Sequence, residues 1–369
     1  MKRFSSLVSV FALSMCTSSP PPAAPASPPP AVPETPAPSA GTSPVDAPRA
    51  AQRGVYVGDI DRRQDPCNDF YEYANGAWRA AHPIPSWMGR WSRRWEAAEA
   101  NKDHLKNILE ETAKRADWPA GSAEQIIGDH YAACTNEEKR NALGIAPIKP
   151  LLDEIDAMKS ARDLPKIFAH LHQLDIAVPF EVGGVQDLHE PSQVIASVAA
   201  RGLGLPDRDY YSKTEPRFVE AREKYREHLT KLYVLAGVPE PKAKAAVGPV
   251  FALEKQLADA SLDNVALRDP HNIDHKISPA DLTKLAPQID WKFYFDSAKI
   301  GWAPLNVEQP KFVTELNRQM QKTPLAVWKD YLKLRVISSA SDSLSNAFGE
   351  EKFAFEGAYL AGAKEIKPR

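Results

Sequence analysis

The sequence predicts a mainly α-helical lobe with one small β-hairpin, preceded by a disordered, proline-rich tether. Apolar residues recur at steps of three and four through most of the chain after residue 50. Two β-branched, apolar runs within about residues 178–199 are typical of a hairpin. Twelve of the 33 prolines lie between Pro20 and Pro48. Such a segment cannot bury a core and favours an extended chain.

The first part of the folded region contains several expected helices. Asp65 and Pro66 predict an N-cap and a first-turn proline. A second helix is expected from Trp91 onward, and a later one is entered from Asp163. The apolar positions that indicate these helices are Phe70, Tyr73 and Ala77; Trp91, Trp95, Ala98, Leu105, Ile108 and Thr112; Ile127, Tyr131 and Cys134; and Leu164, Ile167, Phe168 and Leu171.

The hairpin and further helices follow. Val178–Val185 and Gln193–Val198 are the expected strands. The clearest helix runs over about Thr214–Ala236 and ends at Gly237. Ser278-Pro279-Ala280-Asp281 resembles a capping box. Aromatic residues at helical spacing indicate a core rather than cofactor contacts. The apolar positions of the two later helices are Phe218, Tyr225, Leu229, Leu232 and Ala236, and, after Thr323-Pro324, Trp328, Tyr331, Leu332 and Val336.

The N-terminal residues have the pattern of an export signal. Lys2 and Arg3 precede an apolar stretch, Phe4–Met15, which is shorter than the ~20 residues of a membrane-spanning helix. Leu13-Ser14-Met15-Cys16 resembles a bacterial lipoprotein cleavage box in which Cys16 becomes lipidated, although Met15 departs from the pattern. An ordinary secretory signal is the alternative. We expect a lipoprotein-type signal peptide at 1–16, a disordered linker at 17–50 and a folded domain at 51–369.

Composition and charge exclude several classes of function. The 46 Lys and Arg residues balance 48 Asp and Glu, for a net charge of −2. No nucleic-acid partner is expected, because binding to phosphates needs a cationic surface. Three cysteines are too few for a disulfide scaffold.

The expected location is the bacterial cell envelope, periplasmic or at the cell surface, with membrane contact only through a lipid anchor.

The residues alone show no catalytic centre. His271 and His275 are spaced like the histidines of a zinc-binding helix, but Asn272 stands where a metallopeptidase has its Glu base. Pro270 precedes the pair, and a polar loop is the better interpretation. We find neither a Walker-type phosphate loop nor a Gly-x-Ser-x-Gly elbow. The expectation is therefore no catalytic residue, no metal ligand and no cofactor in this chain.

Several distinctive motifs follow one another along about residues 54–369. They are Asp65-Pro66-Cys67-Asn68-Asp69-Phe70-Tyr71-Glu72-Tyr73-Ala74-Asn75-Gly76-Ala77-Trp78, Ile84-Pro85, Arg90-Trp91, Gly202-Leu203-Gly204-Leu205-Pro206-Asp207-Arg208-Asp209-Tyr210-Tyr211, Leu267-Arg268-Asp269-Pro270, Asn306-Val307-Glu308-Gln309-Pro310 and Phe353-Ala354-Phe355. Taken in this order, they resemble the neprilysin-like zinc metallopeptidases, a family that includes neprilysin, endothelin-converting enzyme and bacterial secreted oligopeptidases.

The resemblance implies the N-terminal, substrate-enclosing domain of an exported zinc metalloendopeptidase that hydrolyses short peptides. The family's zinc-binding half, with its His-Glu-x-x-His helix, is not found in this sequence. We therefore expect the C-terminal catalytic domain as the missing partner, zinc only in the complete enzyme, and no peptide hydrolysis by this chain alone. A stand-alone, non-catalytic envelope binding or scaffold lipoprotein is the alternative.

The resemblance also assigns roles to single residues. Arg90 stands where the family has an Arg associated with the carboxylate end of bound peptides; a second Arg found in some relatives is replaced here by Ala98. In disulfide-bearing relatives, the partners of the cysteines at the positions of Cys67 and Cys134 lie beyond the place of Arg369. Both thiols are therefore expected to be free in this chain.

Overall fold

The computed structural model describes residues 56–115 and 117–367. The expected signal peptide, the linker and Cys16 lie outside this part of the chain. The chain divides into two compact units, one ending at Asn75 and one beginning at Gly76. In the first unit, the buried Asp61 accepts a hydrogen bond from Arg63 Nε at 2.8 Å, and its backbone N–H donates to the Tyr73 carbonyl at 2.8 Å.

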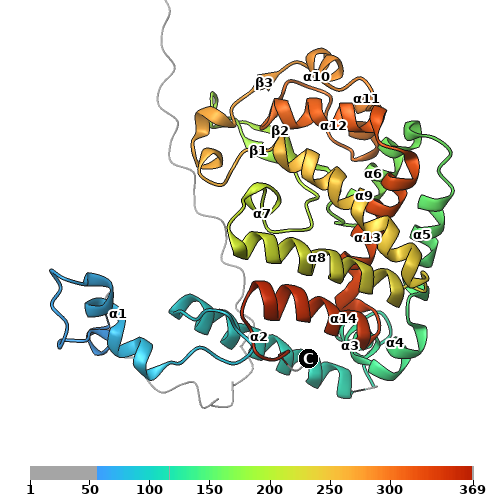
Figure 1. Cartoon of the computed structure of the whole chain (residues 1–369). Coiled ribbons are helices and arrows are strands. Elements are labelled where there is room, and N and C mark those ends of the chain that lie inside the picture. The colour runs from blue at the N-terminus through green and yellow to red at the C-terminus, as the bar shows by residue number, and fades with distance from the viewer. Residues whose placement is uncertain (1–55, 116, 368–369) are drawn as a thin grey trace, which may run out of the picture. The chain divides into compact units, whose positions relative to one another are not determined.

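Helices dominate the structure, which confirms the predicted class (Figure 1). A π-helix follows the last α-helix, at Phe353–Leu360. The α-helices are α1 (Phe70–Ala81), α2 (Arg93–Lys114), α3 (Ala123–Thr135), α4 (Glu137–Leu143), α5 (Lys149–Asp156), α6 (Leu164–Gln173), α7 (Asp209–Ser212), α8 (Pro216–Leu235), α9 (Glu240–Asp259), α10 (Pro279–Leu285), α11 (Trp291–Ser297), α12 (Pro310–Lys322), α13 (Leu325–Ala340) and α14 (Asn346–Lys352).

The predicted hairpin is confirmed as part of a slightly larger sheet. Strands β1 (Phe180–Gln186) and β2 (Val194–Ala200) pair antiparallel. β2 also pairs in parallel with β4 (Leu305–Val307), which pairs antiparallel with β3 (Lys276–Ile277), so the strand order is β1-β2-β4-β3. The sequence did not reveal β3 and β4, because two or three residues are too few to show an alternating pattern.

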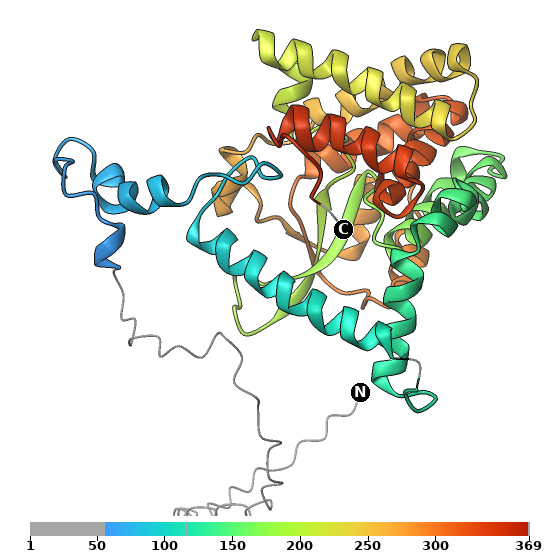
Figure 2. The ribbon, with the colours of Figure 1, turned by 90° about the horizontal axis from the view of Figure 1, so that it is seen from below.

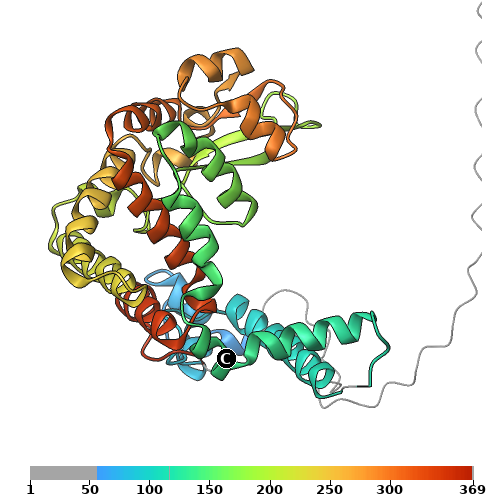
Figure 3. The ribbon, with the colours of Figure 1, turned by 90° about the vertical axis from the view of Figure 1, so that its right-hand side faces the viewer.

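The second unit is built around a core of aromatic and aliphatic side chains. The expected stripes on α8 and α13 are buried there, including Phe218, Tyr225, Trp328 and Tyr331. α8 packs against α9, and α13 packs against both of them. α5 and α13 run side by side (Figure 3). Burying such large side chains supplies the main favourable term for folding.

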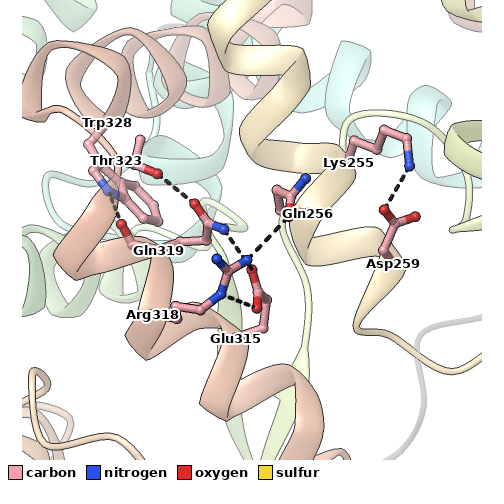
Figure 4. A network of polar contacts seen from close by, with 8 residues as sticks. All are labelled: Lys255, Gln256, Asp259, Glu315, Arg318, Gln319, Thr323 and Trp328. Atoms are coloured by element: carbon pink, nitrogen blue, oxygen red, sulfur yellow. Dashed lines mark hydrogen bonds and ion pairs between the residues drawn. The ribbon is translucent and has the colours of Figure 1, made fainter.

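A polar network joins α9, α12 and α13 beside this core (Figure 4). Arg318 donates from Nε to Glu315 at 2.7 Å and from Nη2 to Gln256 on α9 at 3.2 Å. The buried Gln319 donates to Glu315 at 2.6 Å and accepts from Thr323 at 2.6 Å. Because each buried polar group has a partner, the network fixes α12 without the cost of an unsatisfied group.

The start of α1 corrects one prediction. Asp65 does not cap α1; its side chain accepts from the Cys67 N–H within a turn over residues 66–68. Asp69 accepts from the Glu72 N–H at 2.9 Å instead, and the helix begins at Phe70. Two aspartates four residues apart both suit an N-cap, and the second one starts the helix. Of the capping box predicted at Ser278, the N-cap is confirmed, since the Ser278 side chain accepts from the Asp281 N–H at 3.2 Å; the Asp281 carboxylate accepts from the Ser278 hydroxyl at 2.7 Å.

The apolar stripes of α2 and α3 differ from the largely buried stripes of α6, α8 and α13, and Phe70 at the start of the α1 stripe is likewise 68% exposed. Leu105 and Ile108 on α2 are 52% and 56% exposed, and Ile126 and Ile127 on α3 are also exposed. The spacing rule correctly predicts the helices but not what covers them. No helix in the described part of the chain is long and apolar enough to cross a membrane.

Candidate functional site

The segment that carries Arg90 links α1 to α2 and is bordered by aromatic rings. Trp78 on α1 stacks on His82 with ring centroids 4.8 Å apart. His82 Nδ1 lies 2.8 Å from the Trp78 carbonyl oxygen, so its ring is oriented by the end of α1. On α2, the guanidinium carbon of Arg93 lies 5.3 Å from the centre of the Trp78 ring. Arg93 Nη1 also forms an ion pair with Glu96 Oε2 at 3.3 Å. These contacts hold both ends of the segment.

Arg90 is exposed, and its guanidinium carbon lies 5.3 Å from the centre of the Trp95 ring. It forms no ion pair with any residue in the described ranges. A cation–π contact at an exposed site contributes only about 0.5–1 kcal/mol and leaves the N–H donors of the guanidinium available. Arg90 therefore presents an exposed positive charge with free N–H donors, and such a group suits a carboxylate ligand.

The last described residues fix the same segment from the other side. The backbone N–H of Lys364 donates to the Ser86 carbonyl at 2.6 Å. Figure 2 shows the C-terminal segment reaching the loop that enters α2. The surroundings of Arg90 thus combine residues that lie far apart in the sequence.

A second constellation explains the Gly202–Tyr211 motif. Gly202 has a φ of +84°, and the Tyr331 hydroxyl donates to its carbonyl at 2.8 Å. Gly204 lies against Tyr225, so that a Cβ at position 204 would overlap the Tyr225 hydroxyl. The Tyr211 hydroxyl accepts from the N–H groups of Gly204 and Leu205 at 3.1 and 3.0 Å. The motif therefore folds into a tight loop that only glycine permits at these two positions.

Glu254 on α9 lies behind this loop, 1% exposed. It accepts from Tyr211 at 2.9 Å and from Tyr225 at 3.0 Å. Burial raises the pKa of Glu254 to about 7, although the nearby Arg335 and both hydroxyls act in the opposite direction. Arg335 donates to the carbonyls of Ala177 and Leu203 at 3.0 and 3.2 Å. The group is a buried scaffold for the motif and not an open reaction centre.

Sequence reasoning missed Glu254 and Arg335. One signal was present: Glu254 occupies a place in an otherwise apolar stripe on α9, with Val250, Leu253 and Leu257 around it. A carboxylate at such a place needs buried partners. The sequence could not name those partners, because Tyr211, Tyr225 and Arg335 come from other helices.

The histidine pair forms no zinc site. The segment Pro270–Asn272 is a short 3-10 turn, in which the His271 side chain is 95% exposed and contacts Asp269 at 2.9 Å. His275 lies past the end of this turn, and its backbone N–H donates to Asn306 at 2.7 Å. Within residues 56–115 and 117–367, no three His, Cys, Asp or Glu side chains come together as metal ligands. The donors present therefore do not fit the zinc centre of a metallopeptidase.

Cys67 and Cys134 are both free and exposed. The Cys134 sulfur lies 3.6 Å from His130 Nε2, one turn earlier on α3.

Comparison with known proteins places this fold. A family model described as Peptidase family M13 matches residues 66–369. Endothelin-converting enzyme 1 of Rattus norvegicus is 27% identical over 315 residues, which are 80% of this chain and 40% of that protein. Neprilysin-3 of Drosophila melanogaster is 28% identical over 251 residues, 65% of this chain and 31% of that protein.

Solved structures share the fold at low sequence identity. The Mycobacterium tuberculosis zinc metalloprotease Zmp1, in complex with an inhibitor, gives a TM-score of 0.77 at 23% identity, over 85% of this chain and 48% of that one. PepO from Lactobacillus rhamnosis HN001 gives a TM-score of 0.69 at 17% identity, over 83% of this chain and 48% of that one. The chain thus spans less than half the length of these relatives. The matched residues nevertheless make up most of the sequence, and the chain belongs to peptidase family M13, the neprilysin-like zinc metallopeptidases, as the N-terminal domain of that family.

Proposed function

We propose that residues 51–369 form the substrate-enclosing domain of an exported zinc endopeptidase that hydrolyses short peptides. The observation that carries this proposal is Arg90, an exposed guanidinium with no acidic partner among the described residues. The family resemblance associates this position with the carboxylate end of bound peptides. A planar guanidinium binds a carboxylate through two parallel hydrogen bonds, which also fixes its orientation. Arg90 would hold the C-terminal end of a peptide while another part of the enzyme cleaves it.

Catalysis in this proposal needs a second, zinc-binding half, in the same polypeptide or in a separate one. Zinc there would polarise the scissile carbonyl and activate water. The described residues of this chain bring no suitable donor set together, so they contribute binding and enclosure. Enclosing the substrate excludes bulk water and strengthens every charge interaction inside.

The exposed aliphatic side chains of α2 and α3 support a partner of this kind. The two helices pack closely, since a Cβ at Gly128 would overlap the Thr112 carbonyl oxygen. Leu105, Ile108 and Ile126 nevertheless remain more than half exposed. Exposed aliphatic side chains on two helices that pack together are typical of an interaction site. We assign this face to contact with the peptidase half.

Arg90→Ala tests the substrate role. In the enzyme that combines this domain with its zinc-binding half, the change should reduce kcat/KM for peptides with a free C-terminal carboxylate. A charge-assisted hydrogen bond contributes about 1.5–3 kcal/mol, so the loss should be about tenfold or more. The corresponding C-terminal amides should be affected much less. Kinetics on matched acid and amide peptides measure the difference.

Arg217→Ala is the matched control. Arg217 is also exposed, and its guanidinium carbon lies 4.4 Å from the centre of the Phe218 ring at the start of α8. Removing it should leave the acid-to-amide ratio unchanged. Equal losses on acid and amide substrates in the Arg90 variant would show that Arg90 is structural and would contradict the proposed function.

We further propose that Cys16 is lipidated and anchors the protein to the bacterial cell envelope. Replacing Cys16 with serine removes the thiol that carries the lipid. The variant should leave the membrane fraction or fail to mature, whereas wild-type protein should partition with membranes. Fractionation, with mass analysis of the mature N-terminus, measures this. A soluble wild-type protein without lipid would refute the anchor.

A further inference from the structure

The C-terminal segment, residues 361–367, crosses the turn that precedes Arg90 and continues to α2. We propose that this segment, which we call the C-terminal strap, positions Arg90 for its substrate, with Gly89, Glu365 and Lys367 as positioning residues. The proposal rests on the proposed function, because it assigns these residues a role through Arg90. It concerns residues that the resemblance to the family did not single out.

Main-chain hydrogen bonds attach the strap to the turn. The N–H groups of Lys364 and Glu365 both donate to the Ser86 carbonyl, at 2.6 and 3.3 Å. The Ser86 hydroxyl donates to the carboxylate of Glu365. The same turn is closed by the Met88 N–H, which donates to the Pro85 carbonyl at 2.9 Å. Ser86, four residues before Arg90, is therefore fixed by both its backbone and its side chain.

Gly89 brings the strap into direct contact with the residue before Arg90. A Cβ at position 89 would overlap the carbonyl oxygen of Ala361. Nothing in this contact depends on a positive φ; glycine is needed only because two backbones approach closely. The peptide unit that leads into Arg90 is thus packed against the beginning of the strap.

The end of the strap is anchored to α2. The Lys367 ammonium pairs with Glu99 and lies 5.9 Å from the centre of the Trp87 ring. Glu99 is buried on α2 and also accepts from Lys102 at 2.8 Å. The two ammonium groups, Lys102 first, hold the pKa of Glu99 below its usual value. An ion pair with a buried carboxylate depends on its partner more strongly than a pair on the surface.

Arg90 accordingly lies between two points that the strap holds. The strap's contacts with Ser86 and Gly89 fix the chain before Arg90. The ion pair between Lys367 and Glu99 fixes α2, which carries the Trp95 ring that Arg90 contacts. A binding group must be held to within a fraction of an ångström for its full effect on the reaction. Loosening the strap should therefore weaken carboxylate recognition without touching Arg90 itself.

The test compares acid and amide peptides in the complete enzyme. Gly89→Ala should reduce the acid-to-amide ratio of kcat/KM almost as much as Arg90→Ala, which is about tenfold. Lys367→Met should reduce the ratio by about threefold, because one of several anchors is lost. Lys367→Arg should keep the wild-type ratio of kcat/KM, since the positive charge remains. All three variants should retain their kcat on amide peptides.

Lys255→Met is the matched control for the loss of a lysine. Lys255 pairs with Asp259 at 2.7 Å on α9, outside the strap (Figure 4), and the ratio should not change. An Arg90→Ala variant that keeps the wild-type ratio refutes the proposed function. If Arg90→Ala lowers the ratio while Gly89→Ala and Lys367→Met do not, the positioning role is wrong and the proposed function stands. Should Gly89→Ala fail to fold, the Lys367 pair alone decides the matter.

Discussion

Replacing Gly204 with alanine is expected to destabilise the domain by at least about 3 kcal/mol. The added methyl group would occupy the place of the Tyr225 hydroxyl. That hydroxyl donates to the buried Glu254 at 3.0 Å, and Tyr225 is itself only 3% exposed. The ring cannot move aside without losing this hydrogen bond. The expected cost therefore combines overpacking with a buried carboxylate that loses a donor.

The loss should extend to the neighbouring part of the motif. The Gly204 N–H donates to the Tyr211 hydroxyl, which donates in turn to Glu254. A displacement of the Gly204 backbone removes the first of these bonds and weakens the second. Because hydrogen bonds in such a network depend on one another, the total effect should exceed that of a single overpacked site.

Gly183→Ala provides the matched control. Gly183 lies within β1, and a Cβ there meets no atom within 4 Å. This change should stabilise the domain by about 0.5–1 kcal/mol, because glycine loses more backbone freedom on folding than alanine does. Urea unfolding of the two variants should move the midpoint in opposite directions with unchanged slope. An unaffected midpoint in the Gly204 variant would show that the motif is not packed against Tyr225 as described.

The contrast between these glycines shows how far the sequence could predict the fold. Helical periodicity correctly predicts α8 and α13, because a buried helix face requires apolar residues at that spacing. It did not single out α9, whose pattern is interrupted by Pro249 and by Glu254. Only tertiary contacts show that the carboxylate has partners and that Gly204 has no room for a side chain.

The candidate site was predictable to a smaller extent. The position of Arg90 came from the resemblance, whereas its contact with Trp95 and the absence of an acidic partner among the described residues required the structure. The strap could not be foreseen, since Ser86 and Glu365 are 279 positions apart. The exposure of Leu105 and Ile108 was also hidden, because spacing cannot show whether another chain segment covers a helix.

The second large effect is expected in the pH dependence of stability, where Glu254 and His172 act in opposite directions. Burial raises the pKa of Glu254 from 4.5 to about 7. Its stabilising contribution is therefore complete below pH 4.5 and is lost as the pH rises through 7. Burial lowers the pKa of His172 from 6.5 to about 4. Its contribution is complete above pH 6.5 and is lost as the pH falls through 4.

Each contribution amounts to about 3 kcal/mol. The two windows overlap between pH 4.5 and 6.5, so in the wild-type chain they largely cancel there. His172 is partly buried next to the sheet, with Nδ1 2.7 Å from the Tyr294 hydroxyl and its ring against Phe180. Glu254 lies behind the Gly202–Tyr211 motif. Because they share no hydrogen-bond partner, substitutions at the two sites should act independently.

Glu254→Gln and His172→Gln separate the two contributions. Relative to the wild-type chain, Glu254→Gln should gain about 3 kcal/mol between pH 4.5 and 7, and His172→Gln should lose about 3 kcal/mol between pH 4 and 6.5. Subtracting the wild-type curve removes every group that all three proteins share, including the carboxylates that titrate at lower pH. Urea unfolding at half-unit pH steps measures both differences. If the two difference curves ran parallel, or if both were flat, the burial of one or both groups would not govern their titration.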